Sequence, residues 1–196
     1  MLKNIIVTFV LFKELALGYI NIYPAFFYER IPEKGVFKKF TLTNRRSEKI
    51  KYRLYLEENV LRDVDIEIYP KSIILKPFEK SEVRVLIKKK KNSEKKEFTE
   101  KLIIKEVELP GQKKKILTML KFKLSGFIGE LSPKLQIQRN TLGKITLKNI
   151  GERTGIYDVY TSKEKYIDTI ILKKQEEKDI EDKGEKLIFK EKYENK

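Results

Sequence analysis

Alternating apolar and polar residues occupy two neighbouring stretches early in the chain. Between residues 36 and 43 the apolar Phe40 and Leu42 alternate with polar residues, and between 50 and 56 every second residue is apolar. The residues between these stretches, 44–48, are polar and typical of a turn. A period of two on both sides of a turn predicts two antiparallel strands that each bury one face.

The same pattern recurs later in the chain. Residues 145–149 (Ile-Thr-Leu-Lys-Asn) repeat 40–44 (Phe-Thr-Leu-Thr-Asn), and 157–160 (Tyr-Asp-Val-Tyr) repeat 52–55 (Tyr-Arg-Leu-Tyr). Both matches are displaced by 105 residues, from 44 to 149 and from 52 to 157. Two matches at one spacing predict two related β domains in tandem.

The region from Tyr19 to Phe127 consists of β-prone runs separated by turn signals. About seven such runs occur, with a turn signal roughly every ten residues. This spacing is typical of an immunoglobulin-like β-sandwich, here without a disulfide. We therefore expect a first domain of this kind at residues 19–128.

From residue 129 the pattern restarts in a shorter form. The stretch 173–186 is polar all round, and we expect it to form a long loop. The predicted fold class is all-β, with two tandem immunoglobulin-like β-sandwich domains, of which the second, at 129–196, is short enough to lack a closing strand. The strand candidates of this second domain are 135–137, 144–148, 156–160, 167–172 and 187–189.

The first 18 residues have the pattern of a signal peptide. A lysine near the start is followed by an apolar run at 5–12 and by the small residues Ala16 and Gly18, which match the small-residue pattern of a signal-peptidase site. The run is shorter than the ~20 apolar residues that span a bilayer, so no stable membrane insertion is expected. This interpretation predicts a periplasmic protein whose mature chain begins near Tyr19. A buried first strand is the alternative, favoured by the two charged residues that interrupt the segment.

The residue types available exclude most catalytic and metal sites. The chain contains no cysteine and no histidine, which removes disulfides, thiolate or imidazole metal ligands, and nucleophiles paired with histidine. All nine glycines are isolated, so a glycine-rich phosphate loop is absent. One acidic cluster lies in a stretch too polar to be buried, and carboxylates need burial or a close like charge for acid–base work. We therefore predict no enzyme, no cofactor and no metal. The cluster comprises Glu176, Glu177, Asp179, Glu181 and Asp182.

The net charge of +15 raises the question of nucleic acid. Most of the positive charge is lysine, and glutamate is interleaved with it almost throughout. Nucleic-acid sites concentrate arginine and aromatic residues on one face, because base contacts and stacking need them. The diffuse lysines predict a solvated surface with a secondary attraction to anionic partners, and no nucleic acid. Nucleic-acid binding stays open only for a chain that keeps its leader and remains in the cytoplasm.

Five short motifs come one after another in a recognisable order. They are Gly-Val-Phe-Lys-Lys-Phe-Thr-Leu-Thr-Asn at 35–44, Ile-Ile-Leu-Lys-Pro-Phe-Glu at 73–79, Val-Glu-Leu-Pro at 107–110, Phe-Lys-Leu at 122–124, and Leu-Lys-Asn at 147–149. In order and spacing they resemble the periplasmic pilus (fimbrial) assembly chaperones, the PapD-like family. The resemblance covers most of residues 19–172, although each motif alone is short.

The resemblance implies a chaperone that donates the last strand of its first domain to a pilin-like or other exported β-rich subunit. An outer-membrane usher is a further candidate partner. The implied donor residues are Ile116, Thr118 and Leu120, and the implied ligands for the subunit's terminal carboxylate are Lys123 and Arg30. Arg30 lies about two positions from its place in the family pattern, and Thr118 stands where the family has an apolar residue.

The alternative is a structural or adhesive module of the cell envelope with the same immunoglobulin-like domains. A chaperone needs an open, apolar edge on the last strand of its first domain, whereas a module that stands alone blunts such an edge with charge. The lysines at 113–115 favour blunting at one end, and the apolar residues within 116–120 favour an open edge at the other.

Overall fold

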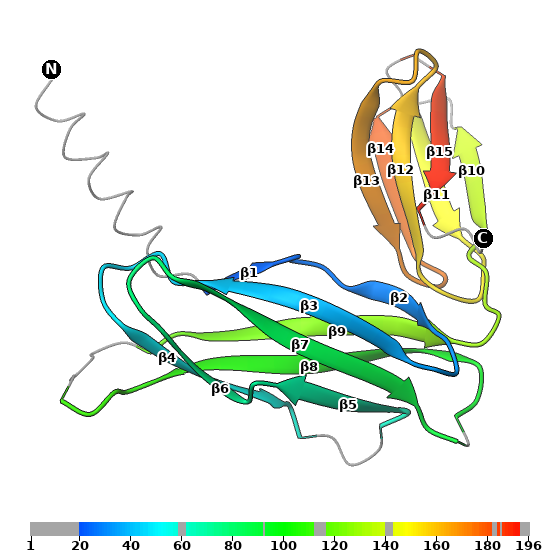
Figure 1. Cartoon of the computed structure of the whole chain (residues 1–196). Helices are drawn as coiled ribbons and strands as arrows, with labels where there is room; N and C mark the ends of the chain where they lie inside the picture. Colours follow the sequence, from blue (N-terminus) through cyan, green and yellow to red (C-terminus); the bar gives the residue numbers. More distant parts are fainter. Residues whose placement is uncertain are drawn as a thin grey trace, which may run out of the picture. The chain divides into compact units, whose positions relative to one another are not determined.

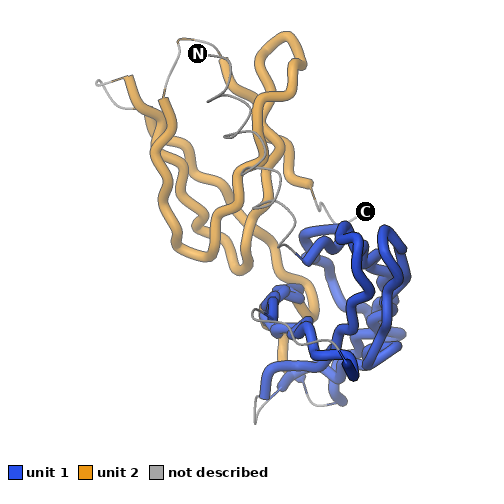
Figure 2. Tube along the Cα trace, turned by 90° about the vertical axis from the view of Figure 1, so that its left-hand side faces the viewer, with its two compact units in different colours: residues 1–93, 98–126 blue, residues 94–97, 127–196 orange. Residues whose placement is uncertain are grey.

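The computed structural model describes residues 20–58, 62–91, 93–111, 117–139, 143–181, 184 and 186–192, and these residues form strands and turns (Figure 1). The chain divides into two compact units (Figure 2). The first contains the described residues up to Ser93 and Phe98–Gly126, and the second contains Glu94–Glu97 and the described residues from Phe127 onward. The predicted signal peptide lies outside the described residues. Within them, no helix has the length and apolar character needed to cross a membrane.

One sheet of the first unit has four antiparallel strands. Its inner face carries the residues that the alternating pattern marks as buried, among them Phe40, Leu42 and Val85, all without solvent exposure. The predicted turn at 44–48 connects this sheet to the next one. In spatial order the strands are β1 (Asn21–Tyr23), β3 (Val36–Thr43), β7 (Lys80–Lys89) and β5 (Val64–Tyr69).

The other sheet of the first unit has five strands. The two sheets meet through aromatic residues, and the ring of Phe40 packs edge-on against that of Phe122 at 5.1 Å between centroids. The β-prone stretch that begins at Tyr19 supplies one strand to each sheet, because Pro24 lacks an amide hydrogen and separates β1 from β2. In spatial order the strands are β2 (Tyr28–Ile31), β9 (Met119–Ile128), β8 (Lys96–Val107), β4 (Ile50–Leu56) and β6 (Ser72–Leu75).

The second unit is a smaller sandwich of two three-stranded sheets. Its core contains Leu147, Val159, Ile170 and Leu172, with Phe189 packed against them. One sheet has the order β10 (Leu135–Arg139), β11 (Lys144–Asn149) and β14 (Glu177–Glu181). The other has the order β13 (Tyr166–Leu172), β12 (Gly155–Thr161) and β15 (Leu187–Glu191). Two tandem immunoglobulin-like sandwiches, the second shorter, confirm the predicted fold class.

The prediction of a long loop at 173–186 is wrong, because this stretch contains β14. Hydrogen bonds to β11 hold this edge strand in place, so it needs little apolar burial of its own. Its acidic residues are exposed and pair across the strands, Asp179 with Thr146 at 2.8 Å and Glu177 with Lys148. Ile180 alone contacts the core. Of the acidic cluster, Asp182 lies outside the described residues.

The sequence repeat corresponds to a repeat of hydrogen bonds around two buried asparagines, Asn44 and Asn149. Each accepts a hydrogen bond from the amide two residues ahead and donates one to the carbonyl four residues ahead. Each also donates to the carbonyl at the end of the strand that precedes a charged turn, Leu75 at 3.4 Å or Leu172 at 3.0 Å. The equivalence of the two units is therefore present at the level of single atoms. The local partners are Arg46 (2.9 Å) and Glu48 (2.7 Å) for Asn44, and Gly151 (3.0 Å) and Arg153 (2.7 Å) for Asn149.

Candidate functional site

The last strand of the first unit, β9, has a free edge along its first half. β9 has ten residues, and its neighbours in the sheet are β8 on one side and the four-residue β2 on the other. β2 lies beside only the second half of β9, where the amide of Ser125 donates to the carbonyl of Phe27 at 3.3 Å. Along residues 119–122 no described strand therefore lies on the outer side of β9.

The main-chain groups along this stretch point alternately toward β8 and toward the free edge. The amide of Glu106 donates to the carbonyl of Thr118 at 2.8 Å, so the main chain of Thr118 faces β8. In an antiparallel ladder the next residue faces the opposite way. The amide and carbonyl groups of Met119 and Lys121 are therefore available to an added strand, with those of Lys123 next to them.

Apolar side chains flank the free edge. Leu117 and Met119 are 39% and 56% exposed, which is high for apolar residues. Thr118 and Leu120 are partly buried and share the inward side of the strand with the buried Phe122. Their role as donor residues stays a prediction, and Ile116 lies outside the described residues. The edge thus combines main-chain groups that no described strand pairs with exposed apolar surface, as the chaperone interpretation requires.

The outer face of the same sheet is cationic. Glu57 accepts hydrogen bonds from Lys101 at 2.6 Å and Lys121 at 2.7 Å. These bonds lower the pKa of Glu57 from 4.5 to about 2, and the same contact raises the pKa of Lys121. Two further cations, Arg53 and Lys105, lie directly opposite each other on β4 and β8. An anionic partner would relieve this like-charge pair.

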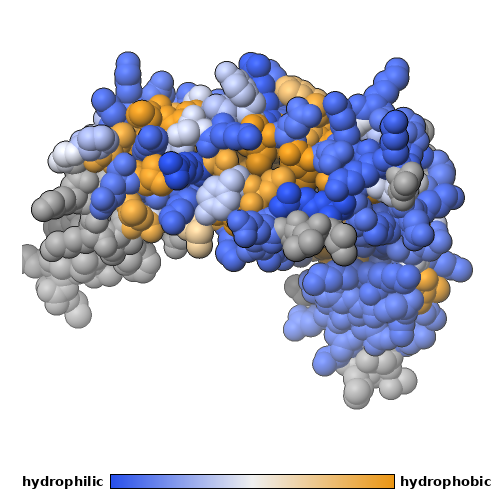
Figure 3. Space-filling model, turned by 90° about the horizontal axis from the view of Figure 1, so that it is seen from below, coloured by the Kyte–Doolittle hydropathy of each residue, from blue (hydrophilic) through white to orange (hydrophobic). Residues whose placement is uncertain are grey.

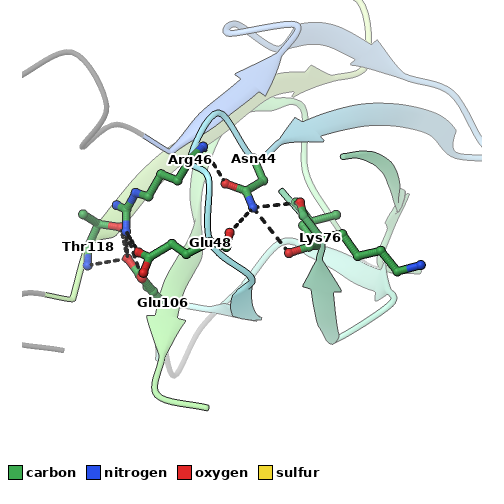
Figure 4. Close-up of polar contacts among 7 residues, drawn as sticks. Asn44, Arg46, Glu48, Lys76, Glu106 and Thr118 are labelled. Carbon is green, nitrogen blue, oxygen red and sulfur yellow. Dashed lines mark hydrogen bonds and ion pairs between the residues drawn. The ribbon is translucent and has the colours of Figure 1, made fainter. Parts of the chain in front are cut away.

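A buried polar network holds the beginning of β9 (Figure 4). Glu106 has no solvent exposure, and one carboxylate oxygen is 3.1 Å from Nη1 of Arg46. The other oxygen accepts hydrogen bonds from the hydroxyl of Thr118 at 2.7 Å and from its amide at 3.2 Å. Thr118 therefore has a structural role at the beginning of β9, because its hydroxyl and amide are both bonded to a buried carboxylate. Glu106 was not among the predicted site residues, although its place in the apolar alternation of Leu102 and Ile104 marks it as inward-facing.

The structure leaves the two implied carboxylate ligands on different strands. Arg30 is exposed on β2, three residues beyond Phe27, and Lys123 is exposed on β9, two residues before Ser125. Counting from the hydroxyl contact between Thr99 and Ser125, at 3.0 Å, puts Lys123 opposite Lys101 on β8. The shared role of Arg30 and Lys123 as carboxylate ligands stays a prediction.

A separate hollow of about 850 Å³ lies beside β5. Apolar residues including Leu54, Ile66 and Tyr69 form much of its wall, and Arg62 there is held 3.2 Å from Glu100. Figure 3, viewed from below, shows apolar surface interrupted by hydrophilic side chains. The chemistry that this hollow offers is apolar contact. Within the described ranges no group of three or more acidic side chains is arranged to hold a metal ion.

These features define a two-domain immunoglobulin-like protein whose first domain ends in a half-open strand. Several solved structures with a similar fold are chaperones. They include the E. coli chaperone DraB (9% identity, TM-score 0.53, covering 83% of this chain and 85% of DraB) and the Pseudomonas aeruginosa CupB2 chaperone (13%, 0.51, 87% and 92%). By sequence, the chain matches no protein-family model and no curated protein. The likeness to PapD-like chaperones is thus confirmed at the level of the fold.

Proposed function

We propose that the protein is a non-enzymatic chaperone that holds an exported β-rich subunit, such as a pilin-like protein, by adding a strand at the free edge of β9. The observation that carries this proposal is the outward-facing main chain of Met119 and Lys121, which no described strand covers. Main-chain hydrogen bonds supply affinity in such strand addition, and alternate side chains supply specificity. The fold shared with the chaperones DraB and CupB2 supports the same class of function.

The charge beside the edge fits a client that brings a carboxylate. Lys123 is exposed and lies opposite Lys101, and no ion pair of Lys123 is found within the described ranges. Lys101 is already bonded to Glu57, so a terminal carboxylate of the client would supply the counterion of Lys123. We propose Lys123 as the first ligand of that carboxylate, with Arg30 as the second.

We further propose that residues 1–18 direct the chain to the periplasm, where the client subunits of such chaperones are found. The folding of the client onto the added strand would supply the free energy of the exchange, so neither nucleotide nor cofactor is needed. An outer-membrane usher is the partner to which a loaded chaperone would deliver.

A structural or adhesive envelope module is the second candidate function. Lys121 and Lys123 lie at the open edge, and natural proteins use lysine at edges to prevent unwanted strand pairing. In that case the same edge would bind no client. The two functions therefore differ in whether the outward amides of β9 form hydrogen bonds in the cell.

Replacing Met119 by proline tests the proposal, because it removes one outward-facing amide while the hydrogen bonds to β8 remain. The tagged wild type and the tagged Met119→Pro variant are purified from their native envelope in high salt. We expect the variant to carry at least about tenfold less bound client, since the loss of edge pairing removes the main source of affinity. The Met119→Val variant keeps the amide and should recover the client normally.

Circular dichroism and the unfolding midpoint establish that both variants are folded. Equal recovery of a β-rich subunit by all three proteins would show that the edge of β9 is not the binding site. Recovery of the wild-type protein without any bound subunit would favour the envelope module.

A further inference from the structure

The two units share a largely buried group of three side chains, which consists of a tyrosine, an arginine and a glutamate. In each unit the tyrosine lies on the strand after the turn that the buried asparagine begins, directly across from the glutamate on the neighbouring strand. An ion pair joins the arginine to the glutamate in both. The members are Tyr52, Arg46 and Glu106 in the first unit, and Tyr157, Arg153 and Glu191 in the second.

The units differ in the strand that lies beyond the glutamate. In the first unit β9 lies beside β8, and Thr118 donates its hydroxyl to Glu106. In the second unit β15 is the last strand of its described sheet. The amide of Lys192 donates to the carbonyl of Ile156 at 2.9 Å, so the main chain of Lys192 faces β12. By alternation, the main-chain groups of Leu187, Phe189 and Glu191 face outward.

The hydroxyl of Tyr157, on the strand next to β15, is an unpaired polar atom of this sheet. Its oxygen is buried and has no hydrogen-bond partner within the described part of the chain. Buried polar atoms are normally paired, so each exception requires an explanation. Tyr157 lies one strand in from the open edge, opposite Glu191. Leu187, Ile188 and Phe189 are only partly buried along the same edge.

We propose that the outer edge of β15 binds an extended segment of a partner polypeptide, in the position that β9 occupies beside β8. The first unit indicates the chemistry of this segment, because the inward side of β9 presents Thr118, Leu120 and Phe122 in succession. The partner segment would carry a hydroxyl residue facing Glu191, with apolar residues two and four positions further on.

The charged residues along the edge of β15 indicate which side chains the outward-facing side of the partner segment would carry. Lys186, Lys190 and Lys192 are exposed there, Lys190 at 3.9 Å from Glu164 and Lys192 at 3.8 Å from Asp158. Acidic residues at the outward positions of the partner segment would complement these lysines. The site lies entirely in the second unit, and the proposal does not depend on the function proposed for β9.

The test uses a synthetic peptide that copies residues 117–126, with glutamate in place of both lysines, added to the full chain. We expect saturable binding and slowed amide exchange at Leu187, Phe189 and Glu191. A peptide with valine in place of its threonine should bind about tenfold more weakly, because it loses a hydrogen bond to a charged group. A peptide with N-methylated alternate amides should not bind, because its main chain cannot pair.

Since only the peptides change, the fold of the protein is not at risk in these comparisons. Equal binding by the N-methylated peptide would overturn the proposal, as it would show adsorption by charge alone. Slowed exchange at Met119 and Lys121, with none along β15, would overturn it as well. The proposal would also be overturned if the unmodified peptide did not bind at all.

Discussion

Replacing Glu106 by alanine is expected to lower the free energy of unfolding of the first unit by about 3–5 kcal/mol, the usual cost of removing one partner from a buried ion pair. The variant leaves Arg46 without its main counterion and removes the acceptor for the hydroxyl and amide of Thr118. Urea-induced unfolding near neutral pH, followed by circular dichroism, measures the change. The exposed Glu82, paired with Lys39 at 3.3 Å, provides the control, and Glu82→Ala should cost less than about 1 kcal/mol.

A double variant separates the ion pair from the packing around it. Replacing Glu106 by leucine and Arg46 by methionine removes both charges at similar volume, and such exchanges are often neutral or stabilising. We therefore expect the double variant to regain most of the stability lost in Glu106→Ala. A cost below about 1 kcal/mol for Glu106→Ala would contradict the burial of this network.

Stability is expected to fall steeply between pH 10 and pH 12, because two buried tyrosines keep their protons in the folded state. Burial first, and then the nearby Glu106, raise the pKa of Tyr52 from 10.0 to about 12. Burial and then Glu191 likewise raise the pKa of Tyr157 to about 12. In this range the unfolded chain has lost protons that the folded chain retains, so the free energy of unfolding decreases as pH rises. At about 1.36 kcal/mol per pKa unit, each tyrosine contributes about 2–3 kcal/mol to the decrease.

Denaturant unfolding at about pH 8, 10 and 12 measures this loss, with tyrosinate absorbance as a direct readout of ionisation. Tyr52→Phe and Tyr157→Phe should each abolish the part of the stability loss above pH 10 that the replaced tyrosine contributes. Tyr23→Phe, at a tyrosine that is 74% exposed, should remove none. If every tyrosine of the folded protein ionised near pH 10, the two buried tyrosines would not have the environment described.

The alternation of apolar residues was sufficient to predict most of the fold. It located β3 and β4 because each buries one face on a core, and the repeated asparagines revealed the second domain because both make the same buried hydrogen bonds. Periodicity failed for β14, since an edge strand can be held by main-chain bonds to β11 with Ile180 as its single core contact. The alternation of side chains carries no information about main-chain pairing, so it does not reveal edge strands that are held mainly by main-chain hydrogen bonds.

The candidate site could be predicted only in part for the same reason. The resemblance to pilus chaperones indicated β9, and the role that it implies for Lys123 stays a prediction. An open edge depends on how far β2 extends along β9, which no local pattern encodes. The inward position of Glu106 was readable from the alternation along β8. Its partners, Arg46 and Thr118, are distant in sequence and come together only in the folded sheet.

Amide hydrogen exchange of the purified protein, alone and with a subunit that copurifies with it, tests the central claim most directly. If β9 donates its edge, the amides of Met119, Lys121 and Lys123 exchange quickly in the free protein and at least about tenfold more slowly in the complex, since strand pairing protects them. The amide of Ser125, already bonded to Phe27, should change little and serves as the internal reference. Unchanged exchange at the three outward amides in a stable complex would contradict strand addition at β9.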